Sequence, residues 1–192
     1  MLTASNMAKH TYPQQFLNTQ VFVGMSPSVE HNVYKLEEFE VIINVSDAPF
    51  LTFEPKEHLH KNVQVLWFPI QETCEWPLAT LDAIVQALQW AHVNHKKVYI
   101  HCEAGANRSP TCVNLWHQIF TPTHTSHLLD EALAKGTITP YTLEALNHRY
   151  TNMEVRKLST DGVAAKANPK EFIARVKHAP ESEASLNKTF TW

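Results

Sequence analysis

The chain has 192 residues, a length typical of one domain with room for a terminal tail. Hydrophobic residues make up 44% of it and charged residues 18%, which excludes collagen-like, coiled-coil and fully disordered classes. Sixteen basic against nineteen acidic side chains give a net charge of -3, and this balance argues against a protein that binds nucleic-acid phosphates.

Strands and helices are predicted to alternate along the chain. Four short apolar runs predict strands at 20–23, 40–45, 63–68 and 97–101. Apolar residues at three- and four-residue steps predict one helix before the last strand and three after it, at 78–91, 110–120, 126–135 and 140–150. This alternation predicts an α/β fold with a mainly parallel central sheet flanked by helices.

The ends of the chain differ in composition from its middle. We expect residues 1–18 to be an N-terminal lead-in, residues 19–153 to form the folded domain, and 154–192 to be a polar tail. A capping pattern predicts a helix near 169–178 that docks on the domain or on a partner. There is no apolar segment of membrane-spanning length, no secretory signal, and three cysteines without a disulfide pattern, so a cytoplasmic location is expected.

The segment from residue 98 to 109 carries the chemistry. A strand delivers Cys102 to its carboxyl end, six residues follow, and an apolar-striped helix then begins. If the loop around Gly105 curls, its amides converge beside a helix N-terminus, which makes an anion site and stabilises a thiolate. Arg108 can clamp two oxygens of a tetrahedral dianion. These parts describe phosphoryl transfer through a thiophosphate.

The string from His101 to Ser109 also resembles the HCxxGxxRS signature of cysteine-dependent protein phosphatases, and the dual-specificity branch in particular. Weaker similarities at 20–24, 41–46, 68–70 and 138–140 extend the resemblance over roughly residues 19–151. A protein tyrosine phosphatase-like fold is what the resemblance implies.

The resemblance also implies a role for each residue of the signature. Cys102 would be the nucleophile, Arg108 would bind substrate and transition state, Ser109 would hydrogen-bond the sulfur, and His101 would brace the loop. The substrate phosphate would be bound by Arg108 and by the loop residues Glu103, Ala104, Gly105, Ala106 and Asn107. No cofactor is implied, and the twelve histidines lack a zinc-ligand pattern, so no metal is expected.

The general acid departs from the family pattern. The family has an aspartate about thirty residues before the cysteine, and Glu72 occupies that place, with Glu75 as its competitor. Asp47 ends a strand at the same sheet edge, where we expect a turn role or the ordering of a loop. Cys74 is either an incidental thiol or one that approaches Cys102 on oxidation.

Helix positions predict the environment of two further residues. Asp82 lies on the polar side of the first helix and is expected at the surface, whereas Cys112 is expected in the core.

The leading interpretation is a protein phosphatase acting on phosphotyrosine, with phosphoserine and phosphothreonine as further candidates. The alternatives are a catalytically weak phosphate-binding module, a phosphatase for a non-protein ester, and a sulfurtransferase of rhodanese type. The expected partner is a phosphoprotein or phosphopeptide rather than a nucleic acid or a membrane, and no oligomeric state is predicted. Glu103 in the loop disfavours polyphosphoinositides, whose phosphatases often carry lysines there.

Overall fold

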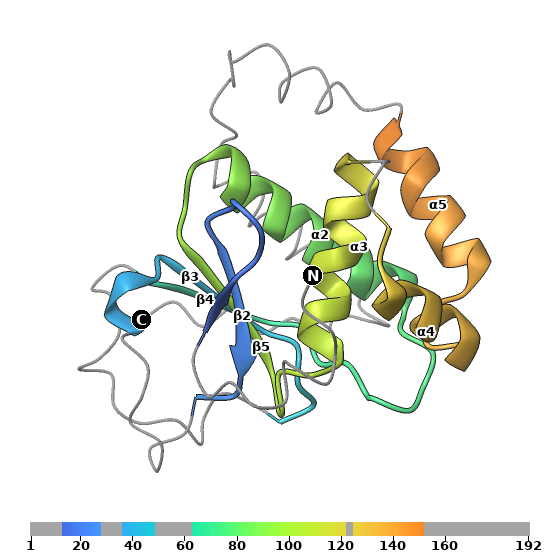
Figure 1. Ribbon diagram of the computed structural model, residues 1–192, viewed down its shortest axis with the longest axis horizontal. Helices are drawn as coiled ribbons and strands as arrows, with labels where there is room; N and C mark the ends of the chain where they lie inside the picture. The colour runs from blue at the N-terminus through green and yellow to red at the C-terminus, as the bar shows by residue number, and fades with distance from the viewer. Residues whose placement is uncertain (1–12, 28–35, 49–62, 122–124, 152–192) are drawn as a thin grey trace.

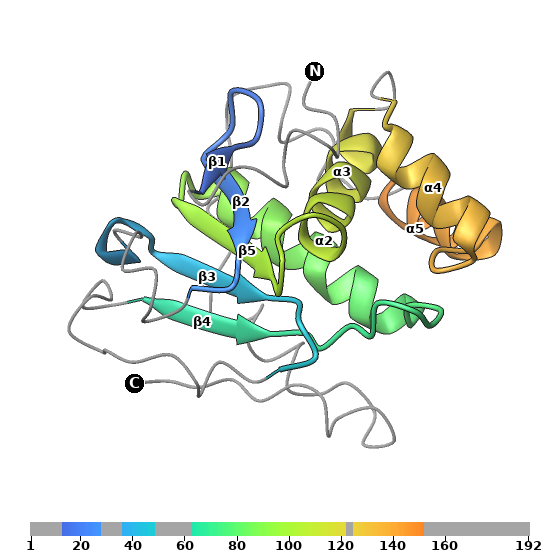
Figure 2. The same cartoon turned by 60° about the horizontal axis from the view of Figure 1, so that its bottom comes forward.

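A five-stranded sheet forms the centre of the structure, a computed structural model that describes residues 13–27, 36–48, 63–121 and 125–151. The strands lie in the order β1-β2-β5-β3-β4 (Figures 1 and 2). Their bounds are Gln14–Gln15 (β1), Val21–Met25 (β2), Val41–Asn44 (β3), Gln64–Trp67 (β4) and Val98–Cys102 (β5). The four strands from β2 to β5 are mutually parallel, which confirms the predicted mainly parallel sheet.

Strand β5 is the middle of the sheet and is buried along its whole length. It pairs with β2 on one side, where Met25 is opposite Cys102, and with β3 on the other, where Asn44 is opposite His101. Because the four strands are parallel, their carboxyl ends share one edge of the sheet. That edge is where α/β folds bind their ligands.

Four α-helices lie on one side of the sheet, as the views in Figures 1 and 2 agree. They are Leu78–Val93 (α2), Arg108–Phe120 (α3), His127–Lys135 (α4) and Pro140–Thr151 (α5). Helix α3 packs against β2 and β5, and α4 and α5 pack on α3. Apolar side chains of the four helices share the larger hydrophobic core with alternate residues of the strands, such as Val21, Ile43 and Ile100. The helices follow the predicted apolar periodicity, and α4 ends at Gly136 in the left-handed conformation that glycine favours.

The opposite face of the sheet carries a smaller core. This smaller core consists of the buried residues Leu36, Phe39, Ile42, Val65 and Tyr99. Leu36 belongs to the short 3-10 helix η1 (Leu36–Glu38). Phe39 and Tyr99 stack with their ring centroids 5.3 Å apart. Both faces of β5 are therefore shielded from solvent, as expected for a parallel strand in the middle of a sheet.

The prediction that Asp82 lies at the surface is wrong. Asp82 is 7% exposed, and it accepts hydrogen bonds from the Tyr150 hydroxyl at 2.6 Å and from Gln86 at 2.8 Å. Arg149 pairs with its second oxygen at 2.7 Å. The polar side of α2 is covered by α5, so a position that periodicity assigns to solvent is a polar link between two helices. Burial and the Asp82 charge raise the pKa of Tyr150.

Strand β1 is not among the strands predicted from the sequence. Gln14 and Gln15 pair antiparallel with Val23 and Phe22, so the sheet starts inside the stretch expected to be a lead-in. Residues 1–12 and the polar tail, with its predicted helix near 169–178, lie outside the described residues. Among the helices that the structure describes, none is long and apolar enough to cross a membrane.

Candidate functional site

Cys102 ends the middle strand and is 2% exposed. The Ser109 hydroxyl lies 3.3 Å from its sulfur and donates toward it. The same hydroxyl is 3.4 Å from the carbonyl oxygen of Gly24 on β2. The first turn of α3 therefore supplies a hydrogen-bond donor to the sulfur, and the sulfur sits beneath the loop that links β5 to α3.

The loop of residues 103–107 turns sharply against the end of β2. Gly105 has φ +68°, and a Cβ there would lie 2.5 Å from the backbone of Gly24 and Met25. The carbonyl oxygen of Glu103 accepts a hydrogen bond from the Ser26 amide at 2.9 Å. Close packing thus fixes the loop, and only glycine fits at its midpoint.

The backbone N–H groups of residues 103–107 donate no hydrogen bond to any residue that the structure describes. They precede α3 directly, and the first amides of a helix also lack intrahelical acceptors. Unsatisfied amides beside a helix N-terminus attract anions. The loop therefore has the donors that an oxyanion site needs.

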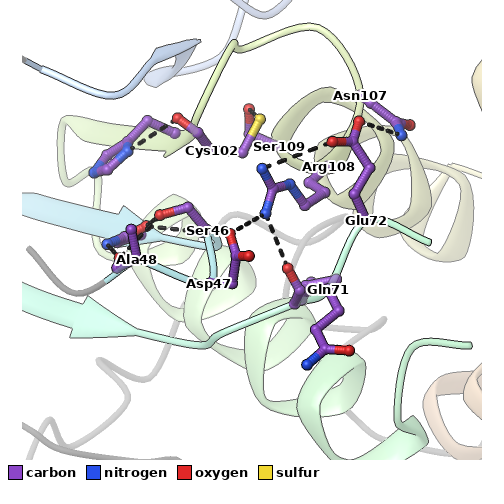
Figure 3. Close-up of polar contacts among 12 residues, drawn as sticks. Ser46, Asp47, Ala48, Gln71, Glu72, Cys102, Asn107, Arg108 and Ser109 are labelled. Atoms are coloured by element: carbon purple, nitrogen blue, oxygen red, sulfur yellow. Dashed lines mark hydrogen bonds and ion pairs between the residues drawn. The ribbon is translucent and has the colours of Figure 1, made fainter. Parts of the chain in front are cut away.

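Arg108, the first residue of α3, is 5% exposed and reaches back to the sheet edge. Figure 3 shows its guanidinium between Cys102 and the carboxylates of Asp47 and Glu72. Its Nη1 donates to Asp47 Oδ1 at 2.8 Å and to the Ile70 carbonyl at 3.0 Å, and its Nη2 lies 3.9 Å from Glu72.

The charges around Arg108 keep it protonated. Burial of the guanidinium opposes its charge, but the hydrogen bond to Asp47 and the negative charges of Cys102, Asp47 and Glu72 outweigh burial and raise the pKa of Arg108. The same hydrogen bond lowers the pKa of Asp47. Asp47 is therefore a carboxylate at neutral pH, and it contacts the arginine rather than only ordering a turn.

Of the two glutamates considered as the acid, only Glu72 lies against the loop. Its Oε1 accepts a hydrogen bond from the Asn107 side chain at 3.1 Å, and its side chain is 54% exposed. Glu75 is exposed and forms no hydrogen bond or ion pair with a described residue. The segment is anchored by Trp76, whose indole donates to the Gln71 carbonyl at 3.0 Å.

His101 is fully buried and stacks on Tyr99 with ring centroids 5.5 Å apart. Its Nδ1 lies 3.4 Å from the Cys102 carbonyl oxygen. Burial lowers the pKa of His101 to about 4, because the buried site disfavours the charged ring. A neutral imidazole therefore lies next to the backbone at the point where the loop begins.

The other two cysteines differ in environment. Cys112 is fully buried in α3, as predicted, and burial together with the nearby Cys102 raises the pKa of its thiol. Cys74 is exposed and donates to the Gln71 side chain at 3.2 Å.

Within the described residues there is no group of three or more histidine, cysteine, aspartate or glutamate side chains that could hold a metal ion. His58 and His60, two histidines that are close in sequence, lie outside those residues.

The ion pair between Asp47 and Arg108 was missed by sequence reasoning. The available signal was that Asp47 follows β3, which pairs with the strand that ends at Cys102.

Known proteins resemble this chain in sequence and in fold. A family model described as the catalytic domain of dual specificity phosphatases matches residues 21–117. A solved structure of a mutant form of Tk-PTP is 21% identical, with a TM-score of 0.54 over 72% of this chain and 97% of that one. The structure of DUSP15 is 16% identical, with a TM-score of 0.52 over 82% and 100% of the two chains. No curated protein sequence gives a significant match.

Proposed function

Because this chain belongs to the dual specificity phosphatase family, we propose that it hydrolyses phosphate monoesters on proteins, phosphotyrosine first and phosphoserine and phosphothreonine as well. The observation that carries this proposal is the set of unused donors beside Cys102. The five loop amides have no acceptor among the described residues, and the buried Nε of Arg108 has none either. A phosphoryl group supplies the oxygens that such donors require.

In the first step, the Cys102 thiolate attacks phosphorus, and the bond from phosphorus to the ester oxygen breaks. Glu72, in its acid form, gives its proton to that oxygen, and the product alcohol or phenol leaves. The loop amides and Arg108 stabilise the charge on the three oxygens of the transferring group.

In the second step, Glu72 as carboxylate takes a proton from a water molecule that attacks the thiophosphate. Inorganic phosphate forms, and the sulfur leaves as a thiolate that the Ser109 hydroxyl stabilises from 3.3 Å. His101 takes no part in proton transfer, because its low pKa keeps the buried ring neutral. Its role is to support the loop.

The charge around the loop favours a protein substrate over a polyphosphorylated one. Glu72 and Asp47 are half exposed or more beside Arg108, and Glu103 is exposed in the loop itself. The other lysines and arginines of the described residues are each paired with a carboxylate: Lys96 with Glu40, Lys97 with Glu38, Lys135 with Glu131 and Arg149 with Asp82. A second or third phosphate would meet like charge here.

Access to the sulfur is the first point to test, because Cys102 is only 2% exposed. We expect iodoacetate, itself an anion, to alkylate Cys102 at neutral pH, and inorganic phosphate to protect it. Cys74, which is exposed and outside the loop, is the internal control and should gain no protection. Mass spectrometry of the peptides reads both sites at once. An unreactive Cys102 would argue against its role as nucleophile.

Hydrolysis is tested with an aryl phosphate, with alkyl phosphates and with a panel of phosphopeptides. Cys102→Ser and Arg108→Ala should abolish turnover, and turnover that survives Cys102→Ser refutes the mechanism. Glu72→Gln should slow alkyl phosphates by roughly 100-fold or more but aryl phosphates much less, because phenolates leave without full protonation. Tight phosphopeptide binding without hydrolysis, even of aryl esters, would instead support a phosphate-binding module.

A further inference from the structure

We propose that Asp47 is a positioning residue that orients Arg108 toward the substrate phosphate, a role that rests on the function proposed above. Asp47 and the Ile70 carbonyl both accept hydrogen bonds from the same guanidinium nitrogen, Nη1, at 2.8 and 3.0 Å. The anchoring is thus concentrated on one corner of the guanidinium. The Nε–Nη2 edge, on the other side, keeps its two parallel donors for a ligand.

The hydrogen bonding of the Nε–Nη2 edge of Arg108 supports the positioning role of Asp47. Nε is buried and has no hydrogen-bond partner among the described residues, and Nη2 lies 3.9 Å from Glu72, beyond hydrogen-bond distance. A buried donor without an acceptor is unfavourable unless a ligand or water satisfies it. Two parallel N–H groups fit two oxygens of one phosphoryl group. An arginine without the Nη1 anchor would have to give up more side-chain freedom when it binds substrate.

Asp47 itself is held by a turn that is fixed at the end of β3. The buried Asn44 side chain accepts from the Ser46 amide at 2.8 Å and donates to the Ala48 carbonyl at 3.0 Å. The Trp67 indole, on the neighbouring strand β4, donates to the Ser46 carbonyl at 2.9 Å. These hydrogen bonds hold Ser46 and Ala48, the residues immediately before and after Asp47 (Figure 3). The sheet therefore orients the carboxylate, and the carboxylate orients the arginine.

Two other roles for Asp47 have different consequences. As a general acid it would need a proton at working pH, but the hydrogen bond from Arg108 lowers its pKa and keeps it ionised. As a purely electrostatic element it would repel the substrate dianion. Its side chain is 63% exposed, so water screens that repulsion, and we expect the loss of the anchor to outweigh the loss of the charge.

The experiment compares Asp47→Ala with Asp47→Asn, which keeps an oxygen that can accept from Nη1 but has no charge. Asp130→Asn, an exposed aspartate on α4, is the control for the same chemical change elsewhere. We expect Asp47→Ala to lower kcat/KM on an aryl phosphate by roughly 10–100-fold and to weaken competitive inhibition by inorganic phosphate to a similar degree. Asp47→Asn should recover most of both, and melting temperatures report folding.

Wild-type inhibition by phosphate in Asp47→Ala would overturn the proposal. So would tighter phosphate binding in both variants, which would indicate repulsion alone. A selective loss of alkyl-phosphate turnover in Asp47→Asn, with the basic limb of the pH profile changed, would assign Asp47 as an acid instead. If the wild type proves inactive, phosphate binding to the full chain still tests the anchor, because Asp47→Ala should weaken that binding whether or not hydrolysis follows.

Discussion

Replacing Gly105 with alanine should disrupt the loop beneath which Cys102 lies. Gly105 has φ +68°, and the new Cβ would lie 2.5 Å from the Gly24 carbonyl carbon and from the Met25 amide nitrogen. These neighbours are backbone atoms of β2, and Met25 pairs with Cys102 itself. Nothing flexible is available to yield, so the loop and the end of β2 must separate.

The size of the effect follows from two contributions. The left-handed conformation costs alanine about 1–2 kcal/mol, and overpacking against fixed atoms adds about 1–3 kcal/mol. The free energy of unfolding should therefore fall by about 2–5 kcal/mol. Gly136 provides a matched control, since its φ is +72° and a Cβ there would meet nothing within 4 Å. Gly136→Ala should cost only the first contribution, about 1–2 kcal/mol.

Urea denaturation of the full chain measures both variants, and hydrolysis of an aryl phosphate measures the site. We expect Gly105→Ala to lose both stability and turnover, while Gly136→Ala keeps its turnover. Equal destabilisation by the two substitutions would show that the contact between Gly105 and β2 does not affect the free energy of unfolding. The conclusion that only glycine fits at this position would then be wrong.

Two further predictions concern buried polar groups. Asp82→Ala should lower the free energy of unfolding by about 2–3 kcal/mol, because the buried Tyr150 hydroxyl loses its charged acceptor. Urea titration measures this loss, with the exposed Asp130→Ala as the control. A loss under about 0.5 kcal/mol would contradict the prediction. His101 has a pKa near 4 in the folded chain against an ordinary 6.5. As pH falls through that window the unfolded chain binds a proton that the folded chain excludes, so stability should decrease, by up to about 3 kcal/mol. His101→Gln should remove this part of the pH dependence, and parallel stability profiles for the two proteins would refute it.

Local pattern was enough to place most of the secondary structure. Apolar runs located β3, β4 and β5 to within a residue or two, and β2 continues past Gly24 to Met25 because Gly24 pairs in the sheet. The segment from Cys102 to Ser109 was recognisable because its parts are consecutive in sequence. Glu72 was found by its distance from the cysteine, and the structure places it 3.1 Å from Asn107.

Contacts between distant segments could not be predicted in the same way. Asp47 and Arg108 are 61 positions apart, and their hydrogen bond depends on β3 and β5 being neighbours. The exposure of Asp82 depends on α5, which covers a side of α2 that periodicity alone assigns to water. Strand β1 is two glutamines long, and neither length nor composition distinguishes such a segment from a loop.

The strand order also determines when this protein can fold as it leaves the ribosome. Strands β2 and β3 emerge early, yet neither contacts the other in the sheet, because β5 lies between them and is synthesised after both. Until β5 emerges, the apolar faces of the earlier strands lack their partner, and such exposed surface invites aggregation. The nascent chain therefore depends on its own later half, and the pairing that finishes the sheet is the one that brings Cys102 into place.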